Sequence, residues 1–280
     1  MVRIFPLIFI LLWSSAFITT KPIIDNSDPF AALAFRFFFV AIGFYIFSIY
    51  SKYSIFISRR NLLESLLSGI LFHGFYLGGV FFSISIGMPT GVAALIVTLQ
   101  PILTNALSGP ILGEKVTTKQ WVGVLLGFIG AILVLGLDVG SDIPSLGLVA
   151  TIVALIAITT STIWQKKLSN NLPLPVSNFY QAIGGCSFHI LIVLFFTEPY
   201  IDFSQTFIIA MCHQVLLVSF GAFTILMYLI KKNSASKTIS IFFLIPATSA
   251  FMAWLFLNEG LTNLDLLGFL ITTIGVYIAT

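Results

Sequence analysis

Long apolar runs, separated by short polar segments, fill almost the whole chain. A helix needs about 20 mostly apolar residues to cross the hydrocarbon core of a membrane. The runs predict ten transmembrane helices, at residues 3–20, 30–50, 62–85, 89–112, 120–137, 145–165, 175–197, 207–230, 237–257 and 264–279. Strands of a membrane barrel would alternate apolar and polar residues, whereas Val122 to Leu137 is apolar throughout. The pattern therefore predicts an all-α integral membrane protein.

Composition agrees with this prediction and leaves no soluble domain. Only 8% of the 280 residues are charged, 58% are hydrophobic, and the mean hydropathy is +1.08. A soluble domain carries about 25% charged residues. Arg3 and the apolar run after it imitate a secretory signal, but no small-residue cleavage site follows, so we interpret the run as a retained first helix.

The basic residues orient the predicted helices, because Lys and Arg are enriched in cytoplasmic loops. With the N-terminus inside, all but two of the thirteen lie on the cytoplasmic side; Lys21 is outside and Arg36 is within the second span. The cytoplasmic set is Arg3, Lys52, Arg59, Arg60, Lys115, Lys119, Lys166, Lys167, Lys231, Lys232 and Lys237. We therefore expect cytoplasmic N and C termini and a multi-pass location in a bacterial inner (plasma) membrane.

The two halves of the chain match at a shift of 145 residues. Pro101 corresponds to Pro246, and the same shift pairs Lys21 with Lys166, Glu114 with Glu259, Thr117 with Thr262, Gly123 with Gly268 and Gly130 with Gly275. We infer two repeats, at 1–140 and 141–280. Each holds five spans, an odd number, so the repeats are inverted relative to each other. Inverted repeats are typical of secondary transporters; a duplicated membrane scaffold or enzyme is the alternative.

Specific residues add a family resemblance. They are the run Trp13 to Phe17, Arg36-Phe37, and the block Pro101…Gly113-Glu114, which recurs as Pro246…Asn258-Glu259-Gly260. In these the chain resembles the drug/metabolite transporter superfamily, in particular its EamA-type branch. The resemblance implies ten helices, cytoplasmic termini, and a substrate site among spans one, three, four, six, eight and nine. It implies no single substrate, because the family carries amino acids, nucleotide-like cofactors, vitamins and drugs.

Arg36 is the sharpest candidate for substrate binding. A charged side chain within a membrane span is costly unless it snorkels, pairs or lines water. Arg36 could face a cavity and attract a carboxylate, reach outward to Asp25 or Asp28, or fix the packing of helices. Its counterpart in the second repeat is the neutral Gln181.

Other polar and aromatic residues of the spans are candidates for the same cavity. Trp13 and Trp164 offer aromatic faces or belong to an interfacial belt. Ser14 offers a hydroxyl, or bonds back to its own helix. The predicted substrate-binding set is Trp13, Ser14, Arg36, His73, Tyr76, Gln100, Trp164 and Gln181.

Proline and glycine mark other functional positions. Pro101 and Pro246 each free a carbonyl one turn earlier, near Val97 and Phe242, and kink the helix; we expect hinges, with fixed bends as the alternative. Small residues let helices approach closely. The glycines of spans five and ten therefore predict helix-packing faces or a homodimer; they are Gly123, Gly127, Gly130, Gly268 and Gly275. Glu114 and Glu259 are expected to cap helices or pair in loops.

Several functions lack their motifs. No Gly-rich loop with Lys-Ser/Thr, zinc motif or nucleophile elbow occurs, and no basic stripe suits nucleic acid. Cys186 and Cys212 lie in apolar stretches, and we interpret them as small buried hydrophobes, not a metal pair. The sequence therefore predicts a secondary transporter, without cofactor or metal, that moves an amino acid or related metabolite across the membrane by alternating access. A membrane enzyme or lipid-handling scaffold is the alternative, and nothing resembles the filter of a channel.

Overall fold

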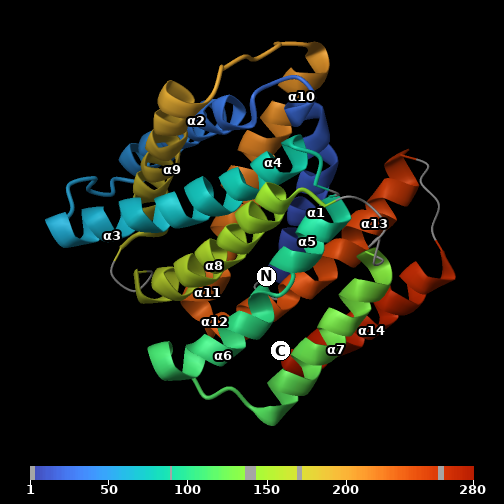
Figure 1. Ribbon diagram of the computed structural model, residues 1–280. Helices are drawn as coiled ribbons and strands as arrows, with labels where there is room; N and C mark the ends of the chain where they lie inside the picture. The colour runs from blue at the N-terminus through green and yellow to red at the C-terminus, as the bar shows by residue number, and fades with distance from the viewer. Residues whose placement is uncertain (1–3, 89, 136–142, 169–171, 258–261) are drawn as a thin grey trace.

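A computed structural model describes residues 4–88, 90–135, 143–168, 172–257 and 262–280, and these form helices joined by short loops (Figure 1). In that part of the chain, the single strand-like contact is an isolated bridge between Ser27 and Ile201. Nine of the described helical segments are long and apolar enough to cross a membrane. The prediction of an all-α membrane protein is confirmed. The last helix is apolar but has 17 residues, so a tenth span stays a prediction.

Six of the predicted spans are uninterrupted helices. They are α1 (Phe5–Ile24), α2 (Pro29–Tyr50), α7 (Thr118–Leu135), α8 (Ser145–Leu168), α9 (Leu174–Phe196) and α14 (Asn263–Ala279). Polar side chains set several of their ends. Asp28 caps α2, where its carboxylate accepts the N–H of Ala31 at 2.7 Å. Thr262 and Asp265 form a capping box at the start of α14, which satisfies N–H groups that a helix start leaves unpaired.

Two spans contain a π-helical segment. The third span is α3 (Arg59–Gly69), η2 (Ile70–Leu77) and α4 (Gly78–Ser85); the eighth is α10 (Gln205–His213), η3 (Gln214–Ala222) and α11 (Phe223–Lys232). At the 145-residue shift, Ile70 and Leu77 correspond to Val215 and Ala222, so the two segments occupy matching positions. Short π-helical segments inside α-helices are rare and are frequently found at functional sites.

Two other spans break close to a proline. The fourth is α5 (Thr90–Val97) and α6 (Gln100–Leu112), and the ninth is α12 (Ala235–Ser240), the 3₁₀ turn η4 (Ile241–Phe243) and α13 (Leu244–Leu257). Pro101 and Pro246 follow these interruptions and lack the N–H that would continue the α-helical pattern across them. The breaks lie near Val97 and Phe242, where the sequence predicts the kinks.

The helices pack as two close pairs around a centre that contains α1 (Figure 1). One pair is α2 with α9; the other is α7 with α14. A Cβ added at Gly123 would lie 2.5 Å from the carbonyl oxygen of Gly275, and one at Gly130 would lie 2.6 Å from that of Gly268. These glycines therefore pack α7 against α14 within one chain; a homodimer through glycine faces stays a prediction.

The two cysteines differ in environment. Cys186 on α9 is buried, as expected, whereas Cys212 on α10 is exposed. The prediction for Cys212 was wrong, because an apolar run does not tell which face of a membrane helix packs inward and which meets lipid. Asn258, Glu259 and Gly260 lie outside the described residues.

Candidate functional site

Two adjoining cavities lie beside α1. The larger, of about 610 Å³, is bordered by α1, α4, α5, α7 and the η4–α13 segment. The smaller, of about 50 Å³, lies between α1, α2, η2 and η3. Five residues line both and join them: Trp13, Phe17, Thr20, Tyr76 and Val80. The larger volume is within the 300–1,000 Å³ range of small-molecule sites.

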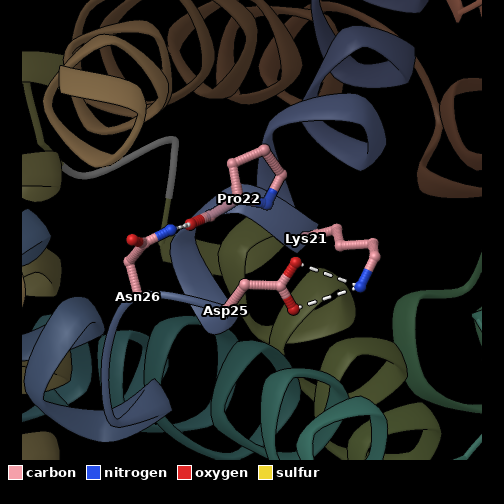
Figure 2. A network of polar contacts seen from close by, with 4 residues as sticks. All are labelled: Lys21, Pro22, Asp25 and Asn26. Atoms are coloured by element: carbon pink, nitrogen blue, oxygen red, sulfur yellow. Dashed lines mark hydrogen bonds and ion pairs between the residues drawn. The ribbon is translucent and has the colours of Figure 1, made fainter. Parts of the chain in front are cut away.

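The larger cavity is mostly apolar and reaches the end of α1. There Lys21 Nζ lies 3.0 Å from a carboxylate oxygen of Asp25 (Figure 2). The Asn26 side chain turns the other way and donates to the Pro22 carbonyl at 2.8 Å. The Lys21 and Asp25 side chains are 79% and 52% exposed, so this ion pair marks a rim where the cavity meets the surface. Among the described lining residues, Asp25 is the sole acid of either cavity.

Arg36 lines the smaller cavity. It lies two turns into α2, which is roughly 10 Å along the axis from Pro29. Its side chain is buried, its Nε–H donates to the Ser219 hydroxyl at 2.9 Å, and its guanidinium carbon lies 5.3 Å from the centre of the Phe37 ring. It does not reach outward to an aspartate.

The Arg36 charge has no counterion in the described part of the chain. No carboxylate oxygen there lies within 4.0 Å of it, since the ion pairs present are Lys21–Asp25 and Arg60–Glu64. A guanidinium carries five N–H donors, and the four on the terminal nitrogens make no hydrogen bond to a described residue. A buried charge without a partner is costly, and a carboxylate in the small cavity would relieve that cost.

The two π-helical segments supply most of the polar side chains around Arg36. His73 and Tyr76 come from η2, and Gln214 and Ser219 come from η3. The His73 ring lies 4.3 Å from the Phe37 ring, centre to centre, and its Nδ1 has no hydrogen-bond partner among the described residues. The smaller cavity is therefore built from α1, α2 and the two π-helical segments, η2 and η3.

Gln214 is an oriented group that the sequence did not single out. Its Nε2 donates to the Ala16 carbonyl at 3.0 Å and to the Thr19 hydroxyl at 2.9 Å. The residue is 1% exposed, and its Oε1 has no partner in the described chain. Next to it, the half-buried His213 contacts Ser15 and Thr19 through its two ring nitrogens, at 3.0 and 3.2 Å. In the sequence, the adjacent polar residues His213 and Gln214 within an apolar span were the signal that could have identified this group.

The structure brings together four of the predicted substrate-binding residues: Trp13, Arg36, His73 and Tyr76 line the smaller cavity. Trp13 and Tyr76 also line the larger one, as does the predicted hinge residue Pro246. These predicted residues come from the first, second, third and ninth spans.

The other predicted residues line neither cavity. Ser14 is bonded to α13, where its hydroxyl donates to the Ile245 carbonyl at 3.3 Å. Gln100 donates to Thr162 of α8 at 3.0 Å. Gln181 is buried in a network with Gln165 and Ser177, at 3.0 Å each. Trp164 on α8 is partly buried, and Pro101 lies at the start of α6. The polar groups of Ser14, Gln100 and Gln181 are used between helices.

A second polar cluster ties α6 and the segment after it to α12. The Glu114 carboxylate accepts the N–H of Ala235 at 2.8 Å and that of Ser236 at 3.3 Å, which caps α12. The Ser236 hydroxyl bonds to the Asn105 amide oxygen and accepts from Gln120 at 3.2 Å. None of these four side chains lines either cavity.

Apolar helices around a cavity with a buried cation define a multi-pass membrane protein of the solute-handling kind. The family model described as the EamA-like transporter family matches residues 3–136 and 145–280. The chain belongs to this family, and it is a membrane transporter rather than an enzyme. The resemblance drawn from Trp13 to Phe17, Arg36-Phe37 and the Pro–Glu blocks is confirmed.

Known proteins resemble the chain over nearly its whole length. It is 26% identical to a probable amino-acid metabolite efflux pump of Escherichia coli (strain K12), over 97% of this chain and 92% of that protein. It is 24% identical to a WAT1-related chloroplastic protein of Arabidopsis thaliana, over 95% of this chain and 66% of that protein. A crystal structure matches with a TM-score of 0.84 at 17% identity, over 100% of this chain and 96% of the other; this likeness shows the fold.

Proposed function

We propose that this transporter carries a small organic metabolite with a carboxylate group, an amino acid or a related compound, across a bacterial inner membrane. The observation that carries the proposal is Arg36, a buried cation that lines a cavity and has no counterion among the described residues. The E. coli relative, named as a probable amino-acid metabolite efflux pump, supports this substrate class.

The proposed topology has ten spans in two inverted repeats, at 1–140 and 141–280, with cytoplasmic termini. The basic residues of the loops support it, and so do the matching π-helical segments and the matching breaks near Pro101 and Pro246. In this topology the Lys21–Asp25 rim follows the first span and lies outside. The Glu114 cluster lies close to the loops after the fourth and eighth spans, on the cytoplasmic side.

The proposed mechanism is alternating access. The larger cavity reaches the Lys21–Asp25 rim, while at the other side Glu114, Asn105 and Gln120 hold α12. In this mechanism the arrangement corresponds to an outward-open form whose cytoplasmic side is closed by polar contacts. The breaks near Pro101 and Pro246 are the natural places for α6 and α13 to move when the closed side opens.

Uptake by purified protein in liposomes tests the proposal. We expect saturable uptake of a carboxylate, stimulated by counterflow. Arg36→Gln should lower transport more than roughly tenfold, since it removes a charge-assisted interaction, and Arg36→Lys should retain part of it. Gln181→Leu alters a buried polar position outside both cavities and is the matched control. Normal transport by Arg36→Gln would refute the anion site.

A further inference from the structure

The lining of the two cavities points to a narrower class of substrate, and this inference rests on the proposed function. We propose that the preferred substrate is an apolar 2-hydroxy carboxylate with a net charge of −1, and that Gln214 accepts a hydrogen bond from its hydroxyl group. A zwitterionic amino acid of the same shape is then the weaker ligand. Three observations carry this proposal: the charge balance of the cavities, the orientation of the Gln214 amide, and the apolar lining next to both.

The charge balance favours an anion over a zwitterion. Among the described lining residues the charged groups are Lys21, Asp25 and Arg36, and the first two pair with each other at 3.0 Å. The interior therefore holds one uncompensated positive charge. A bound monoanion neutralises it, whereas a zwitterion adds an ammonium close to Arg36 and leaves the net charge at +1. No described acid lines the small cavity to receive that ammonium.

The Gln214 amide selects a hydrogen-bond donor. The Ala16 carbonyl can only accept, so the contact at 3.0 Å must come from the Gln214 NH₂ group. That fixes Oε1 as the opposite end of the amide, buried and without a partner in the described chain. An unsatisfied buried acceptor favours a ligand that supplies a donor. Gln214 and Arg36 line the same small cavity, whose volume is about 50 Å³. A space of that size suits a ligand that carries its carboxylate and its donor close together, as on neighbouring carbons.

Both an ammonium and a hydroxyl could donate to Gln214, and the charge balance decides between them. A hydroxyl satisfies Oε1 without adding positive charge next to Arg36. The rest of the ligand meets the larger cavity, where Phe17, Val80 and Ile84 are among the lining side chains. This combination describes a 2-hydroxy acid with an aromatic or branched aliphatic side chain.

A matched series of probes tests the proposal on the purified full-length transporter. Phenyllactate, phenylpropionate, phenylalanine and phenylalaninamide share one ring and differ in charge and donor. We expect phenyllactate to bind roughly tenfold more tightly than phenylpropionate and than phenylalanine, and phenylalaninamide not to compete. Binding of phenylalanine as tight as that of phenyllactate would overturn the proposal.

Variants of Gln214 separate recognition from folding. Gln214→Met should abolish the preference for phenyllactate over phenylpropionate while phenylpropionate still binds. Gln214→Glu supplies the missing negative charge and should reverse the preference, so that phenylalanine binds better than phenyllactate. Gln100→Met changes a buried glutamine outside both cavities and should keep the wild-type order. Unchanged order in Gln214→Glu would overturn the role of Gln214.

The outcomes also distinguish this inference from the proposed function. If phenylalanine binds best and its binding needs Arg36, the anion site stands and the selection for a hydroxy acid is wrong. If no probe of the series binds in a way that depends on Arg36, the proposed anion site is wrong as well.

Discussion

The Nε–H of Arg36 donates to the hydroxyl of Ser219 at 2.9 Å, and this contact joins α2 to η3. The bond fixes one edge of the guanidinium and leaves the terminal nitrogens for a ligand. Ser219 is therefore a positioning residue. It connects the cation of α2 to the π-helical segment η3.

We expect Ser219→Ala to weaken carboxylate binding by about three- to tenfold. Hydrogen bonds to charged groups contribute about 1.5–3 kcal/mol, and other contacts of Arg36 within the cavity offset part of this loss. Folded yield should stay close to wild type. The measurement is the dissociation constant of phenyllactate. Ser177→Ala, which removes a buried hydroxyl outside both cavities, should leave that constant unchanged, and equal effects of both changes would argue against positioning.

Loss of the Glu114 carboxylate should open the cytoplasmic side. Glu114→Ala removes two hydrogen bonds and a favourable charge at the start of α12, which are together worth about 1–2 kcal/mol. The reporter is Ser108→Cys, a buried position whose hydroxyl has no partner among the described residues, with Cys186 and Cys212 replaced by Ala. Its reaction with a thiol reagent should speed up in Glu114→Ala. An unchanged rate would mean that this cluster does not close the transporter.

Glycines between α7 and α14 should tolerate no side chain. Gly123→Ala places a Cβ 2.5 Å from the Gly275 carbonyl oxygen, and such overpacking costs about 1–3 kcal/mol. Thermal unfolding in detergent should show a lower midpoint. Gly109→Ala is the control, since its nearest neighbour would be 3.7 Å away; it should be neutral or stabilising.

Restoring a backbone N–H at either break should slow transport without weakening binding. Pro101→Ala and Pro246→Ala allow a straighter, more continuous helix. If the breaks are hinges, the turnover in counterflow falls several-fold while the phenyllactate dissociation constant of Pro101→Ala is unchanged. Full turnover in both variants would identify the breaks as fixed bends.

Thiol labelling from each side of the membrane checks the topology. In the cysteine-free protein, exposed loop positions Ser58 and Asn233 changed to Cys should react from the cytoplasmic side, and Glu198→Cys from the outer side. Reaction of Ser58→Cys and Asn233→Cys from opposite sides would exclude the inverted repeat.

Hydropathy and charge were sufficient for the class of fold, because lipid requires long apolar helices. The same reasoning located Arg36, since a cation in such a helix stands out. It could not locate Gln214 and Ser219, whose direction depends on the wider turn of η3. Gln100 and Gln181 looked equally suited to a cavity, but Thr162 and Gln165 use their amides between helices. Sequence shows that a polar group is buried but not what it contacts.

The contacts of Gln181 predict how many anions each chain binds. This residue stands at the place in the second half that Arg36 holds in the first. Its amide oxygen accepts from Gln165 and its amide nitrogen donates to Ser177. One half thus contributes the cation and the other contributes no equivalent. A calorimetric titration should therefore saturate at one anion per chain, because the 145-residue match places a cation in the first half and a neutral amide in the second.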